Sequence, residues 1–169
     1  ISETINNAYQ LLEKDVMLTR NAKIEIRLGQ VSVMPEHLLL REFLLNRIAE
    51  ILSDFNDIHI VQSDHSIDIL DSGVSKTNAL VNLRYFLNDE DNILVIGDQG
   101  QYGGNDFKIL NMPFSLSVDK VSSSLNTCWN LSPIGIRGAK ATMSLIDAMK
   151  IGYKKLRLDV DALEGGGQI

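Results

Sequence analysis

The sequence predicts a mixed α/β protein built from two lobes and a tail. Between residues 1 and 71, short segments alternate apolar and polar residues, which is typical of antiparallel strands with one wet face. Between residues 72 and 150, helical patterns flank the unbroken apolar run Ile93-Leu94-Val95-Ile96, which is typical of a strand buried in a parallel sheet. Residues 151–169 are basic, then acidic, then glycine-rich, and we expect a polar tail there.

The first lobe is expected to combine helices with antiparallel strands. In order, the expected elements are a helix over residues 4–14, an alternating segment over 23–33, a helix over 35–54 and strands over 58–62 and 66–70. Gly29-Gln30 either bends the alternating segment or divides it into two strands. Pro35 suits the first position of a helix, with Glu36 favourably placed in its first turn.

The second lobe is expected to alternate helices and strands. In order, the expected elements are a helix capped by residue 75, a polar turn over 88–91, a strand over 93–96, a glycine-rich loop, a helix over 105–110, a strand over 113–118, an irregular segment over 122–132 and a helix over 139–150. Ser75 is a good N-cap because its hydroxyl can accept a hydrogen bond from the first turn. In the tail, Leu156-Arg157-Leu158 is only superficially strand-like.

Composition excludes several classes of protein. The chain has 169 residues, and its 44% hydrophobic content excludes a disordered protein because it can support a core. The formal net charge of −6 argues against a general nucleic-acid binder, which needs an excess of Lys and Arg. Cys128 is the only cysteine, which excludes a disulfide scaffold. With neither a run of about 18 apolar residues nor a visible signal peptide, we expect no membrane span and a cytoplasmic location.

Lys76 is the first candidate functional residue. If Ser75 caps the helix, Lys76 lies in its first turn, where a cation opposes the helix dipole by about 0.3–1 kcal/mol. One interpretation is an ordinary solvated lysine. The other is that Lys76 faces an anion whose attraction outweighs the dipole.

A glycine-rich loop with two acidic residues follows the apolar run, in the sequence GDQGQYGGND at 97–106. Asp98 emerges at the carboxyl end of the predicted strand, where ligand sites in open α/β sheets lie, and Asp106 stands at the head of the next helix. Carboxylates suit Mg²⁺, which binds through one or two of them plus water and substrate phosphate. The alternative is an N-capping aspartate after a flexible loop. The glycines fit neither a Walker A loop nor a dinucleotide fingerprint.

Together, a lysine-bearing helix and a strand ending in Gly-Asp…Asn-Asp resemble the C-terminal half of the haloacid-dehalogenase-like (HAD-like) phosphohydrolases. The segment HSIDILDSGVSKTNAL resembles the end of a cap followed by the third motif of the family, and ILVIGDQGQYGGNDFKIL resembles the fourth. The likeness covers residues from about 20 to 150 and is greatest to the Cof-type and sucrose-phosphatase-like branch. It implies that residues 1–71 are the C-terminal portion of an α/β (C2-type) cap, and residues 72–150 the C-terminal portion of a Rossmann-like core.

The resemblance implies roles for four residues. Lys76 corresponds to the lysine that stabilises negative charge on the phosphoryl group and the nucleophile. Asp98 and Asp106 correspond to the acids near Mg²⁺, and Asn105 to the residue near the substrate phosphate. These roles suit phosphoryl transfer, because its catalysis is mostly positioning and neutralisation of charge.

The chain departs from the family pattern in two places. The loop Gln99–Gly104 makes the gap between Asp98 and Asn105 longer than is usual in the family, so we interpret the loop as an insertion. We expect it to be flexible enough to bring Asp106 back to the edge of the sheet where Asp98 would bind Mg²⁺. The nucleophilic Asp-x-Asp-Gly-Thr motif is absent ahead of Lys76. The only Asp-x-Asp is Asp159-Val160-Asp161, and a polar tail explains it better than a permuted nucleophile, because Ala162-Leu163 replace Gly-Thr.

Two hypotheses about function follow. In the first, the chain is a fragment of a Mg²⁺-dependent phosphatase that hydrolyses a small phosphate monoester, such as a sugar phosphate, through an aspartyl-phosphate. The nucleophile is then expected on sequence absent from this chain, so the chain alone is expected to be inactive and the missing N-terminal half is an expected partner. The absence of an initial Met is interpreted as a cut. In the second hypothesis, the chain is a non-catalytic module of the same fold that binds a phosphorylated ligand or a partner protein.

Overall fold

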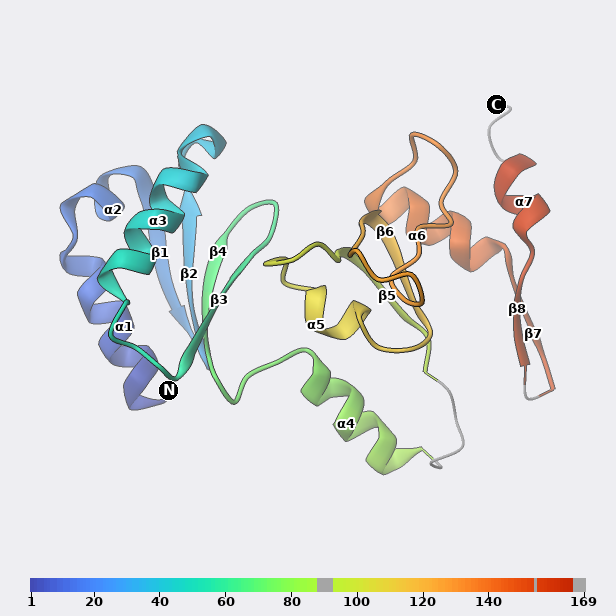
Figure 1. The fold of residues 1–169 in the computed structure, drawn as a ribbon, viewed down its shortest axis with the longest axis horizontal. Coiled ribbons are helices and arrows are strands. Elements are labelled where there is room, and N and C mark those ends of the chain that lie inside the picture. Colours follow the sequence, from blue (N-terminus) through green and yellow to red (C-terminus); the bar gives the residue numbers. More distant parts are fainter. Residues whose placement is uncertain (88–92, 154, 166–169) are drawn as a thin grey trace. The chain divides into compact units, whose positions relative to one another are not determined.

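The computed structural model describes residues 1–87, 93–153 and 155–165. These residues form a four-stranded antiparallel sheet, a parallel pair of strands and an antiparallel hairpin, together with helices, which confirms the predicted α/β fold class (Figure 1). The chain divides into two compact units. Unit 1 comprises Ile1–Ala79 with Gly103–Asn105, and unit 2 comprises Leu80–Tyr102 with Asp106–Ile169.

Unit 1 is an antiparallel sheet covered by helices. Its strands, in the spatial order β1-β2-β4-β3, are β1 (Ala22–Arg27), β2 (Gln30–Pro35), β4 (Ile67–Asp71) and β3 (Ile58–Gln62). Its helices are α1 (Glu3–Lys14), α2 (Val16–Asn21), the 3₁₀ turn η1 (Leu38–Leu40) and α3 (Arg41–Ile51). The expected helix over 4–14 is confirmed, and of the two alternatives at Gly29 the structure shows the division into two strands.

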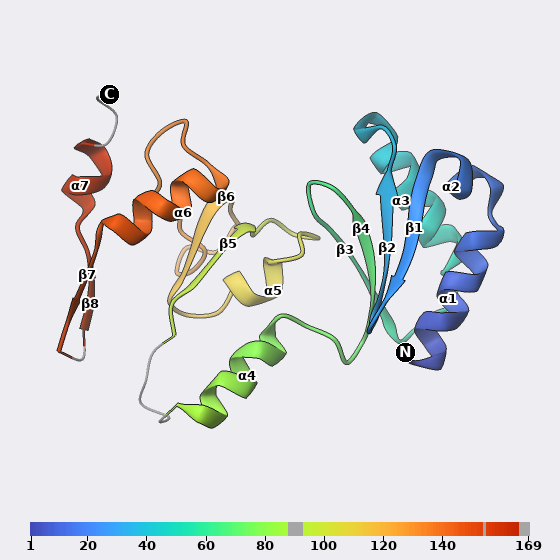
Figure 2. The same ribbon diagram turned by 180° about the vertical axis from the view of Figure 1, so that it is seen from behind.

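Helices α1 and α3 lie on one face of this sheet, as both ribbon views show (Figures 1 and 2). The buried residues of α1 are Ile5, Ala8 and Leu12, which recur at helical spacing and so form one stripe. On the facing strands, Val31 pairs with Ile69, and each is completely buried. Because side chains alternate across a strand, the same pattern places polar residues on the other face of the sheet.

The helix expected from Pro35 begins later than predicted. Pro35 is the last residue of β2 and pairs with Ala22, and α3 begins only at Arg41, after η1. Proline is tolerated at the end of a strand, so its preference for a helix start does not decide its place. The result is that Leu39, at the centre of η1, is 97% exposed, whereas Leu44 in α3 is completely buried.

Unit 2 contains the parallel strands, and the boundary between the units falls inside α4. Its elements are the end of α4 (Thr77–Phe86), β5 (Val95–Gln99), α5 (Phe107–Leu110), β6 (Ser115–Lys120), α6 (Gly138–Asp147), β7 (Met149–Gly152), β8 (Lys155–Leu158) and α7 (Val160–Gly165). Strands β5 and β6 are parallel, as predicted, with Val95 opposite Ser115. The turn expected over 88–91 lies outside the described residues.

The expectation of a strand buried on both faces at 93–96 is wrong. Strand β5 begins two residues later, at Val95, and continues through Asp98 to Gln99; its residues before Gln99 are only half-buried. In the described part of the chain β5 pairs with β6 alone, which leaves its side chains less covered than those of a central strand. Asp98 is therefore inside the strand rather than just after it.

The C-terminal segment is not the polar tail that was expected. Strands β7 and β8 pair antiparallel, with Met149 opposite Leu158, and both residues pack against an apolar cluster that includes Ala141 and Leu145 of α6. Leu163 in α7 is also buried in this cluster. The interpretation of residues 156–158 as only superficially strand-like is therefore wrong, because cross-strand pairing and burial override a weak local pattern. Within the described ranges, no helix has both the length and the apolar character needed to cross a membrane.

Candidate active site

Asp98 lies near the carboxyl end of β5, one residue before the last residue of the strand. It is half-buried, and β6 runs parallel beside it. The pairing becomes irregular between Gly97 and Gln99, so the ladder is interrupted at Asp98 itself. Ligand sites in α/β sheets form at the carboxyl edge of parallel strands. Asp98 therefore lies close to the edge at which the sequence predicted it, although it is inside the strand.

Asp106 folds back against the same strand end. Its Oδ2 accepts hydrogen bonds from the backbone N–H groups of Asp98 at 3.0 Å and Gln99 at 3.2 Å. The residue is 5% exposed, and its own backbone N–H donates to the carbonyl of Gln99 at 3.2 Å. Although Asp106 precedes α5 directly, its side chain makes no capping hydrogen bond there. The carboxylate therefore positions the end of β5 rather than the start of the helix.

Gly97 makes this close approach possible. A Cβ atom on Gly97 would lie 2.7 Å from Oδ2 of Asp106 and 2.9 Å from its carboxyl carbon. Such a contact is too short for any side chain, so only glycine leaves room for the carboxylate. The glycine that precedes Asp98 in the sequence motif thus has a physical role in the position of Asp106.

Asn105 and the last two residues of the expected insertion, Gly103 and Gly104, belong to unit 1. The backbone N–H of Asn105 donates to the carbonyl of Gln62 at 2.9 Å, and the N–H of Gln62 donates to the carbonyl of Gly103 at 3.0 Å. Gly104 forms a parallel bridge with Gln62, so this part of the loop runs beside the end of β3. The Oδ1 of Asn105 is buried and has no hydrogen-bond partner among the described residues, which makes it available to a donor or cation.

Lys76 lies in unit 1 and directly precedes the first residue of α4, Thr77. The Oγ of Ser75 accepts from the N–H of Thr77 at 3.2 Å and shares a hydrogen bond of 2.8 Å with its hydroxyl. Ser75 thus forms a turn one residue earlier than expected. Lys76 is at the cap position rather than in the first turn, with its carbonyl accepting from the N–H of Ala79 at 3.1 Å.

The structure brings the Asp106 carboxylate to the backbone of Asp98 within unit 2, whereas Lys76 and Asn105 are part of unit 1. Among the described residues, no group of three or more His, Cys, Asp or Glu side chains could hold a metal ion. A metal at Asp98 and Asp106 would therefore have at most two carboxylate ligands. This donor set fits Mg²⁺, which keeps several waters, and does not fit the closed site of a structural zinc.

Two residues next to this strand end were not singled out from the sequence. Gln99 is 2% exposed, and its Oε1 accepts from Nζ of Lys120 at 3.1 Å and from Nε2 of Gln101 at 2.9 Å. Lys120 is the last residue of β6, so it lies at the same edge of the sheet as Gln99. The rule that carboxyl ends of parallel strands meet at one edge could have found Lys120, had the strand not been expected to end at Val118.

Comparison with known proteins shows resemblance in part of the fold only. No family model and no curated protein matches the sequence. The N-terminally truncated IMP-nucleotidase of Plasmodium falciparum is similar over 71% of this chain and 35% of that chain, with 20% identity and a TM-score of 0.47. Its IMP-bound form is similar over 72% and 36%, with 20% identity and a TM-score of 0.46.

A third solved structure, the trehalose-6-phosphate phosphatase of Aspergillus fumigatus, is similar over 76% of this chain and 54% of that chain. The identity is 13% and the TM-score is 0.39. The chain thus spans about a third of the nucleotidase chains and about half of the phosphatase chain. Likenesses this distant do not define a family, so the function below is argued from the residues.

Proposed function

We propose that the protein is a Mg²⁺-dependent phosphatase that acts on a small phosphate monoester, with a sugar phosphate as the substrate class. The observation that carries the proposal is the Asp106 carboxylate held at the carboxyl end of β5, against the backbone of Asp98. Asp98 is in the strand, and Oδ2 of Asp106 is held against the backbone of Asp98 and Gln99. Such a pair at such an edge suits a cation that binds substrate phosphate.

Each of the four residues has a distinct role in this proposal. Asp98 and Asp106 would hold Mg²⁺, which when bound neutralises negative charge on the phosphoryl group. Lys76 would stabilise the charge that develops during transfer, and the amide of Asn105 would orient the phosphate. The two backbone N–H groups that hold Asp106 keep its carboxylate in place before substrate arrives.

We assign the nucleophile to polypeptide outside this chain. The one Asp-x-Asp pair supplies Asp159, whose Oδ2 accepts from Nζ of Lys150 at 2.5 Å and whose Oδ1 accepts from the N–H of Ala162 at 3.4 Å. The hydrogen bond from Lys150 holds the pKa of Asp159 below its ordinary value. Both carboxylate oxygens of Asp159 thus hold neighbouring elements, one binding Lys150 of β7 and the other Ala162 of α7. This favours a structural role for Asp159.

Titration with Mg²⁺, followed by NMR, tests the metal site without any need for turnover. We expect the amide signals of Asp98 and Gln99 to shift on Mg²⁺ addition, because both N–H groups contact the Asp106 carboxylate. Asp98→Asn should weaken Mg²⁺ affinity about tenfold or more through loss of a charged ligand. Gly97→Ala should weaken it by about tenfold, because the new Cβ displaces Oδ2 of Asp106.

The matched control is Asp147→Asn, which removes the same charge from an exposed position of α6. This variant should retain the affinity of the unmodified chain. An equal loss for Asp98→Asn and Asp147→Asn would mean that Mg²⁺ screens surface charge only, and would contradict the metal site.

An assay against sugar phosphates with Mg²⁺ tests the reaction itself. We expect no turnover by the 169 residues alone, and turnover by an N-terminally extended form that Lys76→Ala or Asp98→Asn abolishes. Turnover by the 169 residues, abolished by Lys76→Ala, would refute the assignment of the nucleophile to other polypeptide. Mg²⁺-dependent binding of phosphate esters without turnover by either form would instead favour the non-catalytic module.

A further inference from the structure

A pocket in unit 2 lies at the carboxyl end of β6. None of the four residues of the proposed phosphatase site lines it. It has a volume of about 500 Å³ and is formed by the end of β6 together with the loop that leads into α6. Its polar lining comes from Asp119, Lys120, Asn130, Ser132 and Arg137. This volume is within the range of small-molecule sites, which run from about 300 to 1,000 Å³.

The charges of this pocket favour an anion, although the chain as a whole is acidic. Lys120 and Arg137 contribute two cations and Asp119 one anion, and Nζ of Lys120 also donates to Oε1 of Gln99 at 3.1 Å. A single contact of 3.3 Å joins Nη1 of Arg137 to Oδ1 of Asp119, and the Arg137 side chain is 74% exposed. A guanidinium has five N–H donors, so Arg137 can bind a ligand while it keeps this contact.

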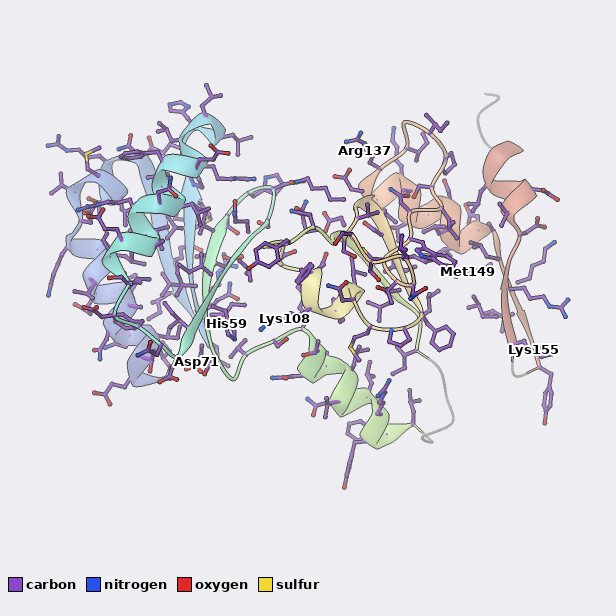
Figure 3. The ribbon with its side chains drawn as sticks, viewed as in Figure 1. His59, Asp71, Lys108, Arg137, Met149 and Lys155 are labelled. Atoms are coloured by element: carbon purple, nitrogen blue, oxygen red, sulfur yellow. The ribbon has the colours of Figure 1, made fainter. Side chains whose placement is uncertain are left out.

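The start of α6, next to Arg137, is also electropositive. Arg137 is the cap residue of this ten-residue helix, and neither a capping side chain nor an acidic first-turn residue satisfies the first N–H groups (Figure 3). The N-terminus of a helix carries a partial positive charge. Arg137, which lines the pocket, therefore lies next to the positive end of α6.

Ser132 supplies a buried polar atom that lacks a partner. Its Oγ is inaccessible to solvent and makes no hydrogen bond within the described residues, whereas its backbone N–H donates to Oδ1 of Asn130 at 3.0 Å. Asn130 is in turn held by its Nδ2, which donates to the carbonyl of Asp119 at 3.0 Å. A buried hydroxyl without a partner is unfavourable unless a ligand or water accepts its hydrogen. The loop thus holds a hydroxyl donor in place among the residues that line the pocket.

The loop itself has a defined shape. The N–H of Ile136 donates to the carbonyl of Pro133 at 3.0 Å, which closes a turn, and Gly135 within it has a φ of +83°. This backbone angle favours glycine, so the turn is encoded locally. Val121, Pro133 and Ile136 add apolar surface to the lining of the pocket.

We propose that this pocket binds a small organic anion, with a phosphate or carboxylate group on Arg137, Lys120 and Ser132 and an apolar body against Val121, Pro133 and Ile136. The site needs neither Mg²⁺ nor the Asp98 carboxylate. It therefore does not rest on the phosphatase proposal, and either can fail without the other.

Calorimetric titration of the 169-residue chain in Mg²⁺-free buffer tests this site. The probes are phenyl phosphate, benzoate and neutral benzyl alcohol, which share an aromatic body and differ in charge. Trp129, the only tryptophan, is adjacent to Asn130 and provides a second signal through its fluorescence. We expect one or both anions to bind at millimolar concentration or below, and benzyl alcohol to bind at least tenfold more weakly.

Arg137→Gln should weaken binding of the anion about tenfold, because a charged hydrogen bond is lost. Ser132→Ala should weaken it a few-fold while removing only the hydroxyl. Lys155→Gln is the matched control, since it removes the same charge from an exposed position of β8 and should leave binding unchanged. Circular dichroism identifies any variant that fails to fold. If either Arg137→Gln or Ser132→Ala does so, the affinity of the other variant for the anion tests the site.

Three outcomes would overturn the site. The first is no heat and no change in Trp129 fluorescence with either anion up to about 10 mM. The second is equal binding of benzyl alcohol, which would leave the charges without a role. The third is an equal loss for Arg137→Gln and Lys155→Gln, which would indicate attraction to overall charge only. If phenyl phosphate binds and benzoate does not, the ligand class narrows to phosphates.

Discussion

Both carboxylate oxygens of Asp15 hold neighbouring elements of unit 1 in place. Oδ1 caps α2 by accepting from the N–H of Leu18 at 2.9 Å, and Oδ2 accepts from Arg47 of α3 at 2.7 and 3.0 Å. Burial raises the pKa of Asp15, but the hydrogen bonds from Arg47 and Leu18 together outweigh it. The pKa therefore lies below its ordinary value, so folding favours the ionised form.

This shift predicts how acid affects stability. Because the folded pKa of Asp15 is depressed, its stabilisation is fully present above the ordinary pKa and is lost as the pH falls through the folded pKa. Asp15→Asn should therefore reduce the loss of unfolding free energy between neutral pH and about pH 3. Asp15→Ala should also remove the cap and cost about 1 kcal/mol more at neutral pH. Urea unfolding at several pH values measures both effects.

Asp54→Asn, at an exposed position of the same unit, is the control for general charge. If Asp54→Asn changes the acid dependence as much as Asp15→Asn does, the contacts of Asp15 are not its source.

At the scale of elements, the segment after β6 returns to cover the parallel pair. The N–H of Ser117 donates to the carbonyl of Trp129 at 2.8 Å, and the N–H of Cys128 donates to Oγ of Ser115 at 2.9 Å. Ser115 is buried and donates in turn to the carbonyl of Leu110 at 2.5 Å. An irregular polar segment is thereby fixed against the strands, because Ser115 and Ser117 of β6 find hydrogen-bond partners in it.

Gly100 is where this packing is closest. A Cβ atom there would lie 2.3 Å from Sγ of Cys128 and 2.8 Å from the carbonyl oxygen of Lys120. Gly100→Ala should therefore lower the free energy of unfolding by about 1–3 kcal/mol, through overpacking. Gly152→Ala, whose new Cβ meets its nearest atom at an ordinary 3.8 Å, should cost less than about 1 kcal/mol. Chemical denaturation followed by Trp129 fluorescence compares the two, and equal effects would refute the close packing.

At the scale of the whole molecule, the described residues contain two separate apolar clusters. The cluster in unit 1 includes Leu44 and Ile48 of α3, and the cluster in unit 2 includes Ala141 and Leu145 of α6. A unit with its own core has its own source of stability. Substitutions in the two clusters should therefore affect different unfolding transitions.

Ile48→Ala should destabilise unit 1 by about 2–5 kcal/mol, because Ile48 is completely buried. Hydrogen exchange of the β2 amides should report this loss, while Trp129 fluorescence in unit 2 should keep its midpoint. Leu145→Ala, at an equally buried position, should do the reverse. If either variant shifts both signals equally, the two units unfold as one.

The extent of sequence prediction differs between the fold and the candidate site. Periodicity placed α1 and the strands of unit 1 at their observed positions, because their side chains meet a single core face, whereas the parallel strands begin two residues later than expected. The sequence also pointed to Asp98 and Asp106 through a local motif. It could not show that Oδ2 of Asp106 binds the backbone of β5, because that contact depends on the path of an eight-residue return.

By itself, the sequence determined the α/β class and the two aspartates as candidates, since both depend on local pattern, and it left a bend and a division at Gly29 as alternatives. Tertiary structure alone decided the late start of α3 after Pro35, the hairpin of β7 and β8, and the gathering of Lys120, Ser132 and Arg137 around one pocket. The physical reason is the same in each case. Strand pairing and burial join residues far apart in the chain, and their free energy exceeds the small local preferences that a sequence pattern reveals.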